Sequence, residues 1–266
     1  MHPKELLDRY QIEPKKSLGQ NFLFDENVLR RIVTAAELQP TDAVLEIGPG
    51  LGALTRLLAQ TAVSVTAVEL DGRLLPILRE ELAHFPNVHL IHGDILEQDP
   101  AQLFARPYKV VANVPYYITG AILRHLLSAA HKPTSMVLTV QKEVADRITA
   151  VPPNMSLLAV SAQVYGPVQQ VATLKAGAFW PRPDVDSAVI RLDIRHTPAH
   201  EEAFFRVVRA GFSQKRKQLH NNLGQLGLKK ADIDTILAAA NIDGRRRAET
   251  LTLDEWQRAA ELIVGS

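Results

Sequence analysis

Cysteine is absent from this sequence of 266 residues, and so is any long apolar run. Without cysteine the chain can form no disulfide, no thiolate nucleophile and no cysteine-based zinc site. No stretch of about 18 apolar residues is present that could span a membrane. The start, Met-His-Pro-Lys-Glu, lacks the apolar core of a secretory signal. We therefore expect a soluble protein of the cytoplasm.

A large excess of charge of one sign is also missing, because the formal net charge is only +1. The basic residues are nevertheless clustered, and no acidic residue occurs between Ala203 and Leu228. Such runs often mark only a solvated helix face, but they can also contact the phosphates of a nucleic acid. The candidate nucleic-acid contacts are Lys15, Lys16, Arg209, Lys215, Arg216, Lys217, Arg245, Arg246 and Arg247.

Apolar strands alternate with amphipathic helices over the first 150 residues. The pattern predicts a helix over 25–38 that begins at Asp25 as N-cap. Further helices are expected over 52–60, 72–83, 121–130 and 141–149, and strands over 43–47, 63–68, 88–91, 109–112 and 136–140. Near-continuous apolar strands with helical crossovers predict a Rossmann-like α/β fold with a parallel sheet covered on both faces.

The rhythm changes beyond Pro153. Two more strands are expected, over 168–174 and 188–194, on either side of a proline-rich loop. From about Thr197 onward only helical patterns occur. We place a domain boundary near His196, between an α/β domain over residues 1–196 and a small all-α domain over 197–266.

A glycine loop, Glu46-Ile47-Gly48-Pro49-Gly50-Leu51-Gly52, joins the strand over 43–47 to its helix. Glycines at this place let the backbone approach a ligand closely. The spacing Gly48-x-Gly50-x-x-Ala53 also fits a loose dinucleotide fingerprint, with Glu69 about 20 residues further on. An enzyme that binds NAD is therefore one reading of this loop.

The charges near the loop favour a different ligand. NAD would place a doubly anionic pyrophosphate beside Glu46, whereas S-adenosylmethionine carries a cationic sulfonium and an ammonium group. Glu69 can accept hydrogen bonds from ribose hydroxyls in both cases. Asp94 can accept from an adenine amine, with Ile95 packed on the ring. These acids and Asn113 end successive strands, where ligands of such sheets bind.

The segment Asn113-Val114-Pro115-Tyr116-Tyr117 follows the strand over 109–112. It offers the amide oxygen of Asn113, the backbone carbonyl of Val114, which the following proline makes rigid, and the aromatic ring of Tyr116. These groups suit a flat base that carries an amino group, because two acceptors can bind its hydrogens and a ring can stack on its face. Asn and Pro are also common turn formers, so a plain strand-to-helix turn is the alternative.

Taken together, the motifs resemble the ribosomal RNA adenine dimethyltransferases. The matching motifs are Gly19-Gln20-Asn21-Phe22-Leu23, Glu46-Ile47-Gly48-Pro49-Gly50, Glu69, Gly93-Asp94, Asn113-Val114-Pro115-Tyr116 and the late motif from Phe179 to Ser187. The segments from Phe212 to Leu219 and from Arg247 to Leu251 are similar to the bacterial small-subunit branch. The antibiotic-resistance branch, which modifies large-subunit RNA, shares the early motifs but resembles this C-terminal part much less. Tyr117 stands where many relatives have Asn, although others also have Tyr.

The resemblance implies a class I methyltransferase sheet, mostly parallel with one antiparallel strand near its end, and an RNA-binding helical domain. It also implies transfer of methyl groups from S-adenosylmethionine to two adjacent adenosines near the 3′ end of small-subunit ribosomal RNA, on an assembling 30S particle. We expect the protein to be a monomer. The expected cofactor-binding residues are Gln20, Asn21, Leu23, Glu46, Gly48, Gly50, Glu69, Leu70, Asp94, Ile95 and Asn113. The expected catalytic residues are Asn113, Val114, Pro115, Tyr116 and Phe179, the last as a second stacking face.

Other readings remain open. A dehydrogenase would bind a nicotinamide cofactor and have no affinity for RNA. A non-catalytic RNA-binding assembly factor would keep the basic clusters and transfer no methyl group. No metal site is expected, because His84, His89 and His92 flank a predicted strand with no carboxylate at a fixed spacing.

Overall fold

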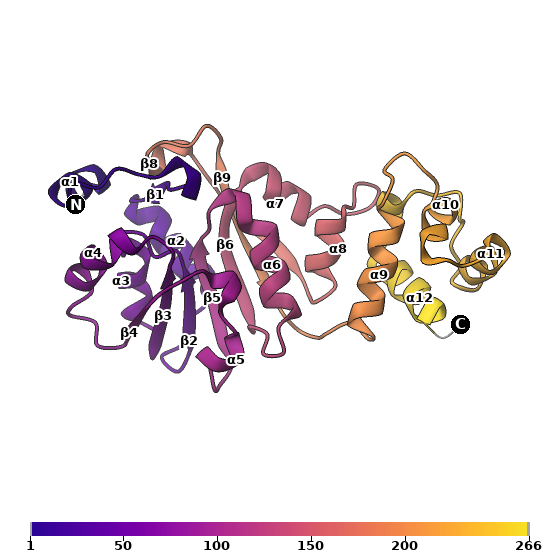
Figure 1. Ribbon diagram of the computed structural model, residues 1–266, viewed down its shortest axis with the longest axis horizontal. Coiled ribbons are helices and arrows are strands. Elements are labelled where there is room, and N and C mark those ends of the chain that lie inside the picture. Colours follow the sequence, from indigo (N-terminus) through magenta and orange to yellow (C-terminus); the bar gives the residue numbers. More distant parts are fainter. Residues whose placement is uncertain (1, 265–266) are drawn as a thin grey trace. The chain divides into compact units, whose positions relative to one another are not determined.

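The structure is a computed structural model that describes residues 2–264, and the chain divides into two compact units (Figure 1). The first unit comprises Met1–Ala145 and Gln169–Ile194, and the second comprises Asp146–Val168 and Arg195–Ser266. In the part of the chain that is described, no helix is long and apolar enough to cross a membrane.

The first unit is built on a seven-stranded sheet in the order β4-β3-β2-β5-β6-β9-β7. Its strands are β2 (Ala43–Ile47), β3 (Ser64–Glu69), β4 (Val88–His92), β5 (Tyr108–Asn113), β6 (Ser135–Gln141), β7 (Val168–Leu174) and β9 (Ser187–Asp193). The pairs β3–β4, β2–β3, β2–β5 and β5–β6 are parallel, and β9 pairs with β6 antiparallel. The expected mostly parallel sheet with an antiparallel strand near its end is confirmed.

Helices connect these strands. They are α2 (Glu26–Ala36), α3 (Ala53–Ala59), α4 (Leu75–Glu81), α5 (Pro100–Leu103), α6 (Thr119–Ser128) and α7 (Lys142–Ile148), with short 3₁₀ turns η2 (Gly72–Leu74), η3 (Ile95–Glu97), η4 (Tyr116–Ile118) and η5 (Ala176–Ala178). Asp25 caps α2 as expected, because its Oδ1 accepts from the amides of Asn27 at 2.9 Å and Val28 at 3.2 Å. Leu29 and Ile32 of α2 and Leu58 of α3 lie in one buried cluster with Val residues of the sheet.

The N-terminal segment adds α1 (Pro3–Arg9), η1 (Lys16–Leu18) and β1 (Phe22–Leu23), which pairs antiparallel with β8 (Phe179–Trp180). Leu6, Leu7 and Phe22 are buried in a second cluster with Ile77 and Leu78 of α4. Burial of these side chains fixes residues 2–24 on the first unit, since each fully buried apolar side chain is worth about 1.5–3 kcal/mol.

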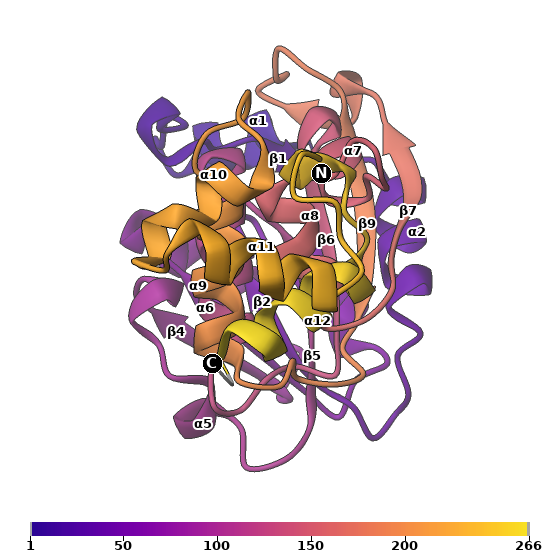
Figure 2. The same ribbon diagram turned by 90° about the vertical axis from the view of Figure 1, so that its right-hand side faces the viewer.

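The second unit is helical, and Figure 2 shows its later helices with their orange to yellow ribbons facing the viewer. They are α9 (Glu201–Gly211), α10 (Leu219–Leu223), η6 (Gly224–Leu226), α11 (Lys230–Ala239), η7 (Ala248–Thr250) and α12 (Leu253–Val264). Trp256 of α12 is fully buried, and its ring stacks on Phe212 with the centroids 5.4 Å apart. Phe204 and Val208 of α9 are buried as well.

The second unit also contains α8 (Leu157–Gln163), a helix that the sequence pattern did not reveal. Residues 146–168, which were expected in the α/β domain, therefore group with the C-terminal helices. Tyr165, just after α8, donates a hydrogen bond to Glu201 of α9, and Met155 donates its amide to the Glu249 carbonyl at 3.0 Å. The other junction, after Ile194, lies close to the expected boundary at His196.

Candidate active site at the carboxyl ends of the strands

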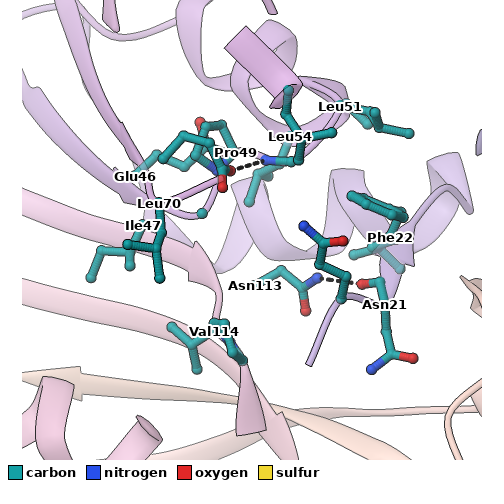
Figure 3. Close-up of a pocket in the computed structure, with 18 of the residues that line it drawn as sticks. Asn21, Phe22, Glu46, Ile47, Pro49, Leu51, Leu54, Leu70, Asn113 and Val114 are labelled. Carbon is teal, nitrogen blue, oxygen red and sulfur yellow. Dashed lines mark hydrogen bonds between the residues drawn. The ribbon is translucent and has the colours of Figure 1, made fainter. Parts of the chain in front are cut away.

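A cavity of about 650 Å³ opens where β2, β3, β4 and β5 end, and residues of the N-terminal segment also line it (Figure 3). Carboxyl ends of adjacent parallel strands meet at one edge of a sheet, so residues far apart in sequence come together there. The expected residues that line the cavity are Gln20, Asn21, Leu23, Glu46, Gly48, Gly50, Glu69, Leu70, Asp94, Ile95, Asn113, Val114, Pro115 and Tyr116. Phe179 is the one expected catalytic residue that does not line it.

The glycine loop contributes backbone to the cavity wall. Gly48, Gly50 and Gly52 have φ values of +66°, +59° and +79°, which favour glycine. A Cβ at Gly48 would meet nothing within 4 Å, so the backbone there borders open space. The Gly48 amide donates to the Val68 carbonyl at 2.9 Å, and the Gly50 amide donates to Glu69 Oε2 at 3.1 Å. These two amides are therefore already used and are not presented to a phosphate group.

Two buried glutamates, Glu46 and Glu69, lie next to this loop and line the cavity. Burial raises the pKa of Glu46 to about 8, and the nearby carboxylate of Glu69 adds to the effect. Burial also raises the pKa of Glu69, although the amides of Asp71 and Gly50 donate to it and oppose the shift. Glu46 is only 1% exposed, and its Oε2 has no hydrogen-bond partner among residues 2–264.

This finding corrects part of the electrostatic argument. Burial favours the neutral form of Glu46 at neutral pH, so its charge alone is a weak reason to exclude a pyrophosphate. The engaged amides of Gly48 and Gly50 supply the stronger reason, because dinucleotide sites use free amides of this loop to bind phosphates.

The remaining cavity wall suits a nucleoside. Asp94 Oδ1 accepts from the Leu96 amide at 2.9 Å, which fixes the carboxylate at the end of β4. Ile95 is buried beside it, whereas Leu70 is 46% exposed and lines the cavity. An acid flanked by two aliphatic side chains can bind the amino edge of a purine and pack against its faces.

Asn113 is the last residue of β5, and its amide group is held in one orientation. Its Nδ2 donates to the backbone carbonyl of Asn21 at 3.1 Å, as the dashed line in Figure 3 shows. No hydrogen bond to Asn113 Oδ1 occurs within the described part of the chain. An amide that donates with its nitrogen in this way keeps its oxygen as an acceptor for a ligand.

Tyr116 is anchored by a residue that the sequence analysis did not single out. Its hydroxyl forms a 2.6 Å hydrogen bond with Ser187 Oγ, and burial raises the pKa of Tyr116. Ser187 is the last residue of the late motif. Phe179 was the residue of this motif that we expected at the site. In the structure it is Ser187 that contacts a site residue, Tyr116.

In this structure Phe179 does not present the expected second stacking face to the cavity. Its side chain is only 3% exposed and belongs to the hydrophobic cluster that contains Leu23 and Val189. Phe179 lies opposite Leu23 in the β1–β8 pair, which directs the ring into the core. Sequence alone could not distinguish a buried aromatic residue from one that faces a ligand.

Gln20 lines the cavity, but both ends of its amide are engaged within the chain. Its Oε1 accepts from the Lys15 amide at 2.7 Å, and its Nε2 donates to Asp71 Oδ2 at 2.9 Å. Asp71 also binds Arg73, with an N–O distance of 2.6 Å, and this ion pair lowers the pKa of Asp71 to about 2. Asp71 and Arg73 were missed, although their position just after Glu69 was a usable signal.

The expected RNA-binding residues fall into two groups. Lys15, Lys16, Arg209, Lys215, Arg216 and Lys217 are exposed and have no acidic partner among the described residues. Residues 215–217 lie in the loop between α9 and α10, so this cluster is not the solvated helix face considered as its alternative.

The arginines at 245–247 differ from that group because each has an acidic neighbour. Arg246 binds Glu255 at 2.5 Å and also donates to the Thr250 carbonyl, so it holds η7 and α12 together. Arg245 pairs with Asp243 at 3.0 Å, and Arg247 lies 4.0 Å from Glu249. Arg246 therefore has a structural role in this fold. Its expected contact with RNA stays a prediction.

A family model described as ribosomal RNA adenine dimethylase matches residues 12–263. The chain belongs to the ribosomal RNA adenine dimethylase family. The resemblance stated from the motifs is confirmed, and so is the expected class of enzyme, an adenine dimethyltransferase.

Named relatives of this dimethylase-family chain are similar over nearly its whole length. Ribosomal RNA small subunit methyltransferase A of Dehalococcoides mccartyi is 47% identical over 270 residues, which cover 99% of this chain and 93% of the relative. The protein of the same name from Bacillus pumilus is 43% identical over 276 residues, covering 98% and 94%.

Two solved structures are similar as well. The 23S rRNA methyltransferase ErmE gives a TM-score of 0.74 at 31% identity and covers 92% of this chain and 100% of its own. A dimethyladenosine transferase from Plasmodium falciparum gives a TM-score of 0.75 at 23% identity, covering 90% and 95%, and supports the fold. The class I methyltransferase fold expected from the sequence is confirmed, and enzymes of this class generally use S-adenosylmethionine.

Proposed function

We propose that this protein transfers methyl groups from S-adenosylmethionine to the 6-amino groups of two adjacent adenosines in a hairpin near the 3′ end of small-subunit ribosomal RNA. The observation that carries the proposal is the fixed amide of Asn113 at the cavity wall. Its nitrogen is bound to the Asn21 carbonyl, so its oxygen is left to accept from an amino group.

The residues of the cavity fit S-adenosylmethionine. Glu69 and Asp94 supply acceptors for the ribose and the adenine amine, while Leu70 and Ile95 supply apolar surface. The unpartnered Oε2 of Glu46 is a buried polar atom that needs a ligand or water to complete its hydrogen bonding. The backbone at Gly48 leaves room for a ligand at close approach. The cofactor would supply an electrophilic methyl group on its sulfonium.

The chain's own residues prepare the acceptor base. The lone pair of an adenine amino group is delocalised into the ring, which makes the nitrogen a poor nucleophile. Asn113 Oδ1 and the Val114 carbonyl accept the two amino hydrogens and draw the nitrogen toward a tetrahedral geometry. Tyr116, held by Ser187, stacks on the base. Positioning of this kind can lower a barrier by about 7–11 kcal/mol.

No general base is needed before the attack. The methylated nitrogen is strongly acidic and loses a proton to solvent. After the first transfer one hydrogen remains on the amino nitrogen, so the second transfer proceeds with one of the two acceptors engaged. The same site can therefore perform both transfers to one adenosine.

The basic loop over 215–217 and the lysines at 15 and 16 would bind RNA phosphates. The substrate would be an assembling 30S particle in the cytoplasm, with the protein acting as a monomer. The engaged amides of Gly48 and Gly50 disfavour the NAD-dependent alternative. The RNA-binding assembly factor without catalysis remains the rival that an experiment must exclude.

The test is transfer of tritiated methyl groups to unmodified small ribosomal subunits, followed by nucleoside analysis of the RNA. We expect label in dimethyladenosine at two adjacent positions. Binding of subunits without incorporation of label would overturn the proposal in favour of the assembly factor. Label in a base other than adenine would overturn the role given to Asn113 and Val114.

A further inference from the structure

Tyr117 has a place in the structure that differs from that of its neighbour Tyr116. It lines the cavity, yet 59% of its surface is exposed. Its hydroxyl has no hydrogen-bond partner among residues 2–264, whereas Tyr116 is half-buried and bound to Ser187. An aromatic ring that is exposed at the mouth of a cavity is available as a stacking surface for a base.

The position of the Tyr117 ring is fixed by the N-terminal segment. A Cβ added to Gly19 would lie 3.3 Å from Tyr117 Cδ1, 3.4 Å from Cε1 and 3.5 Å from Pro115 Cβ. Gly19 has a φ of +60°, so its backbone reaches the ring in a conformation that side-chain-bearing residues rarely adopt. One side of the ring thus packs on Gly19 while much of its surface stays open.

Two unpaired cations belong to the same turn. Lys15 and Lys16 are exposed and have no acidic partner within the described chain. The turn is held together because the Gly19 amide donates to the Lys16 carbonyl at 2.9 Å and the Lys15 amide donates to Gln20 Oε1 at 2.7 Å. A pre-positioned aromatic ring beside cations is the combination with which proteins bind single-stranded nucleotides.

We infer that Tyr117, together with Lys15 and Lys16, forms a second nucleotide subsite at the cavity rim. It binds the nucleotide adjacent to the target adenosine, with the base stacked on the ring and the phosphates near the lysines. The inference rests on the proposed function. Because two adjacent adenosines are the proposed targets, the subsite holds one of them while the other occupies the cavity.

The subsite can be tested with substitutions at Tyr117 that separate packing from stacking. Tyr117→Leu keeps an apolar side chain against Gly19 but removes the aromatic face, whereas Tyr117→Phe and Tyr117→Trp keep it. We measure KM for unmodified small subunits in methyl transfer, and the Kd of S-adenosylmethionine by calorimetry. Base–aromatic stacking of about 1–3 kcal/mol corresponds to about a 5- to 150-fold change in KM.

We expect Tyr117→Leu to raise KM within this range, while Phe and Trp restore it to within about twofold of the parent. Cofactor affinity should stay within about twofold throughout. The double substitution Lys15→Ala/Lys16→Ala, made in the parent protein, should also raise KM and reduce its dependence on salt. A parental KM for Tyr117→Leu would overturn the subsite, as would weaker cofactor binding with an unchanged KM. Failure of the parent protein itself to methylate subunits would instead reject the proposed function.

Discussion

At the scale of single residues, burial controls the charge of the cavity. Glu46 and Glu69 share one wall, and both carboxyl groups have a raised pKa because they are removed from water. A bound cation would favour the ionised form of Glu46 and so couple ligand binding to proton release. The sequence identified both acids, but their protonation follows from the tertiary structure.

Glu46 gives a prediction for the pH dependence of stability. Its pKa is about 8 in the folded chain and 4.5 for an ordinary glutamate, so the folded chain binds this proton more tightly than the unfolded chain does. The free energy of unfolding should therefore be highest below the ordinary pKa. It should fall as pH rises toward 8, by at most about 1.4 kcal/mol per pH unit. Urea unfolding between pH 5 and 9 would measure this.

Glu46→Gln should flatten that profile and raise stability above pH 8, because it removes the cost of ionising a buried carboxyl. A smaller slope of the same sign should remain from Glu69. Glu97→Gln, at an exposed glutamate, is the matched control and should leave the profile unchanged. Parallel profiles for Glu46→Gln and the parent would show that Glu46 is not the titrating group.

Asn113 gives a prediction for activity. Asn113→Ala removes the acceptor for the amino group, and displacement of reacting groups by about 1 Å can already cost on the order of 100-fold in rate. We expect kcat to fall at least about 100-fold, while the Kd of S-adenosylmethionine rises only a few-fold. Single-turnover methyl transfer and calorimetry measure the two quantities.

Asn21→Ala is the companion variant, because it keeps the backbone carbonyl that holds Asn113. It should raise the cofactor KM and change kcat little. If Asn113→Ala retained parental kcat, the mechanism given for the amide would be wrong.

At the scale of elements, the N-terminal segment is fastened to the sheet through Asp71. This carboxylate binds Gln20 from one side and Arg73 from the other, and Arg73 donates to the Glu13 carbonyl at 3.3 Å. The segment that carries Asn21, the partner of Asn113, thus depends on a charge located after β3.

Asp71→Asn should loosen this segment. The substitution removes the ion pair with Arg73, and hydrogen bonds to charged groups contribute about 1.5–3 kcal/mol each. We expect faster hydrogen exchange over residues 15–24 and about a tenfold weaker Kd for S-adenosylmethionine. Asp99→Asn is the control, since Asp71 Oδ1 caps η2 by accepting from the Arg73 amide and Asp99 Oδ1 caps α5 in the same way. Equal exchange in both variants would contradict the fastening role.

The contact of α9 with α12 gives a second prediction at this scale. A Cβ at Gly211 would lie 2.3 Å from Trp256 Cη2, so the two helices meet where no side chain fits. Gly211→Ala should lower the free energy of unfolding by about 1–3 kcal/mol through overpacking. Gly224→Ala, where a Cβ would meet nothing within 4 Å, should leave stability unchanged or slightly higher. Urea denaturation measures the free energy of unfolding of both variants. Equal values would show that the contact of Gly211 with Trp256 leaves room for a side chain.

At the scale of the whole molecule, the net charge of +1 hides an uneven distribution of basic residues. Among the expected RNA contacts, those without an acidic partner in the described chain lie at 15–16, at Arg209 and in the α9–α10 loop. The arginines at 245–247 are instead paired with acids. The salt dependence of RNA binding should follow those of the unpaired residues that contact phosphates, because each such contact releases counterions.

Lys215→Ala/Lys217→Ala should raise KM for small subunits and reduce its salt slope by roughly 1–2, since each phosphate contact contributes about 0.7–0.9 to the slope. Lys229→Ala/Lys230→Ala removes the same charge from the same unit and is the control. The measurement is the steady-state KM at several salt concentrations. The same effect from both pairs would indicate a general influence of charge and no specific contact at the loop.

Much of the fold follows from local pattern. The helix over 25–38 and its Asp25 cap, and the strands over 43–47 and 168–174, depend on periodicity and capping, which are local. The helix α8 was missed because it is only 7 residues long and mostly apolar, so it shows little helical periodicity. Its membership in the second unit could not be inferred from residues 157–163 alone.

The sequence by itself determined the family, the sheet and the set of residues at its carboxyl edge. Strands that alternate with helices form a parallel sheet, and the carboxyl ends of such strands lie at one edge. The tertiary structure alone decided which of these residues are free to act. In the folded chain Phe179 and Glu46 are buried, and Tyr117 is exposed. The amides of Gly48 and Gly50 donate hydrogen bonds within the chain, and Arg246 is paired with Glu255. Burial and hydrogen-bond partners depend on residues far apart in the chain, and no local pattern encodes them.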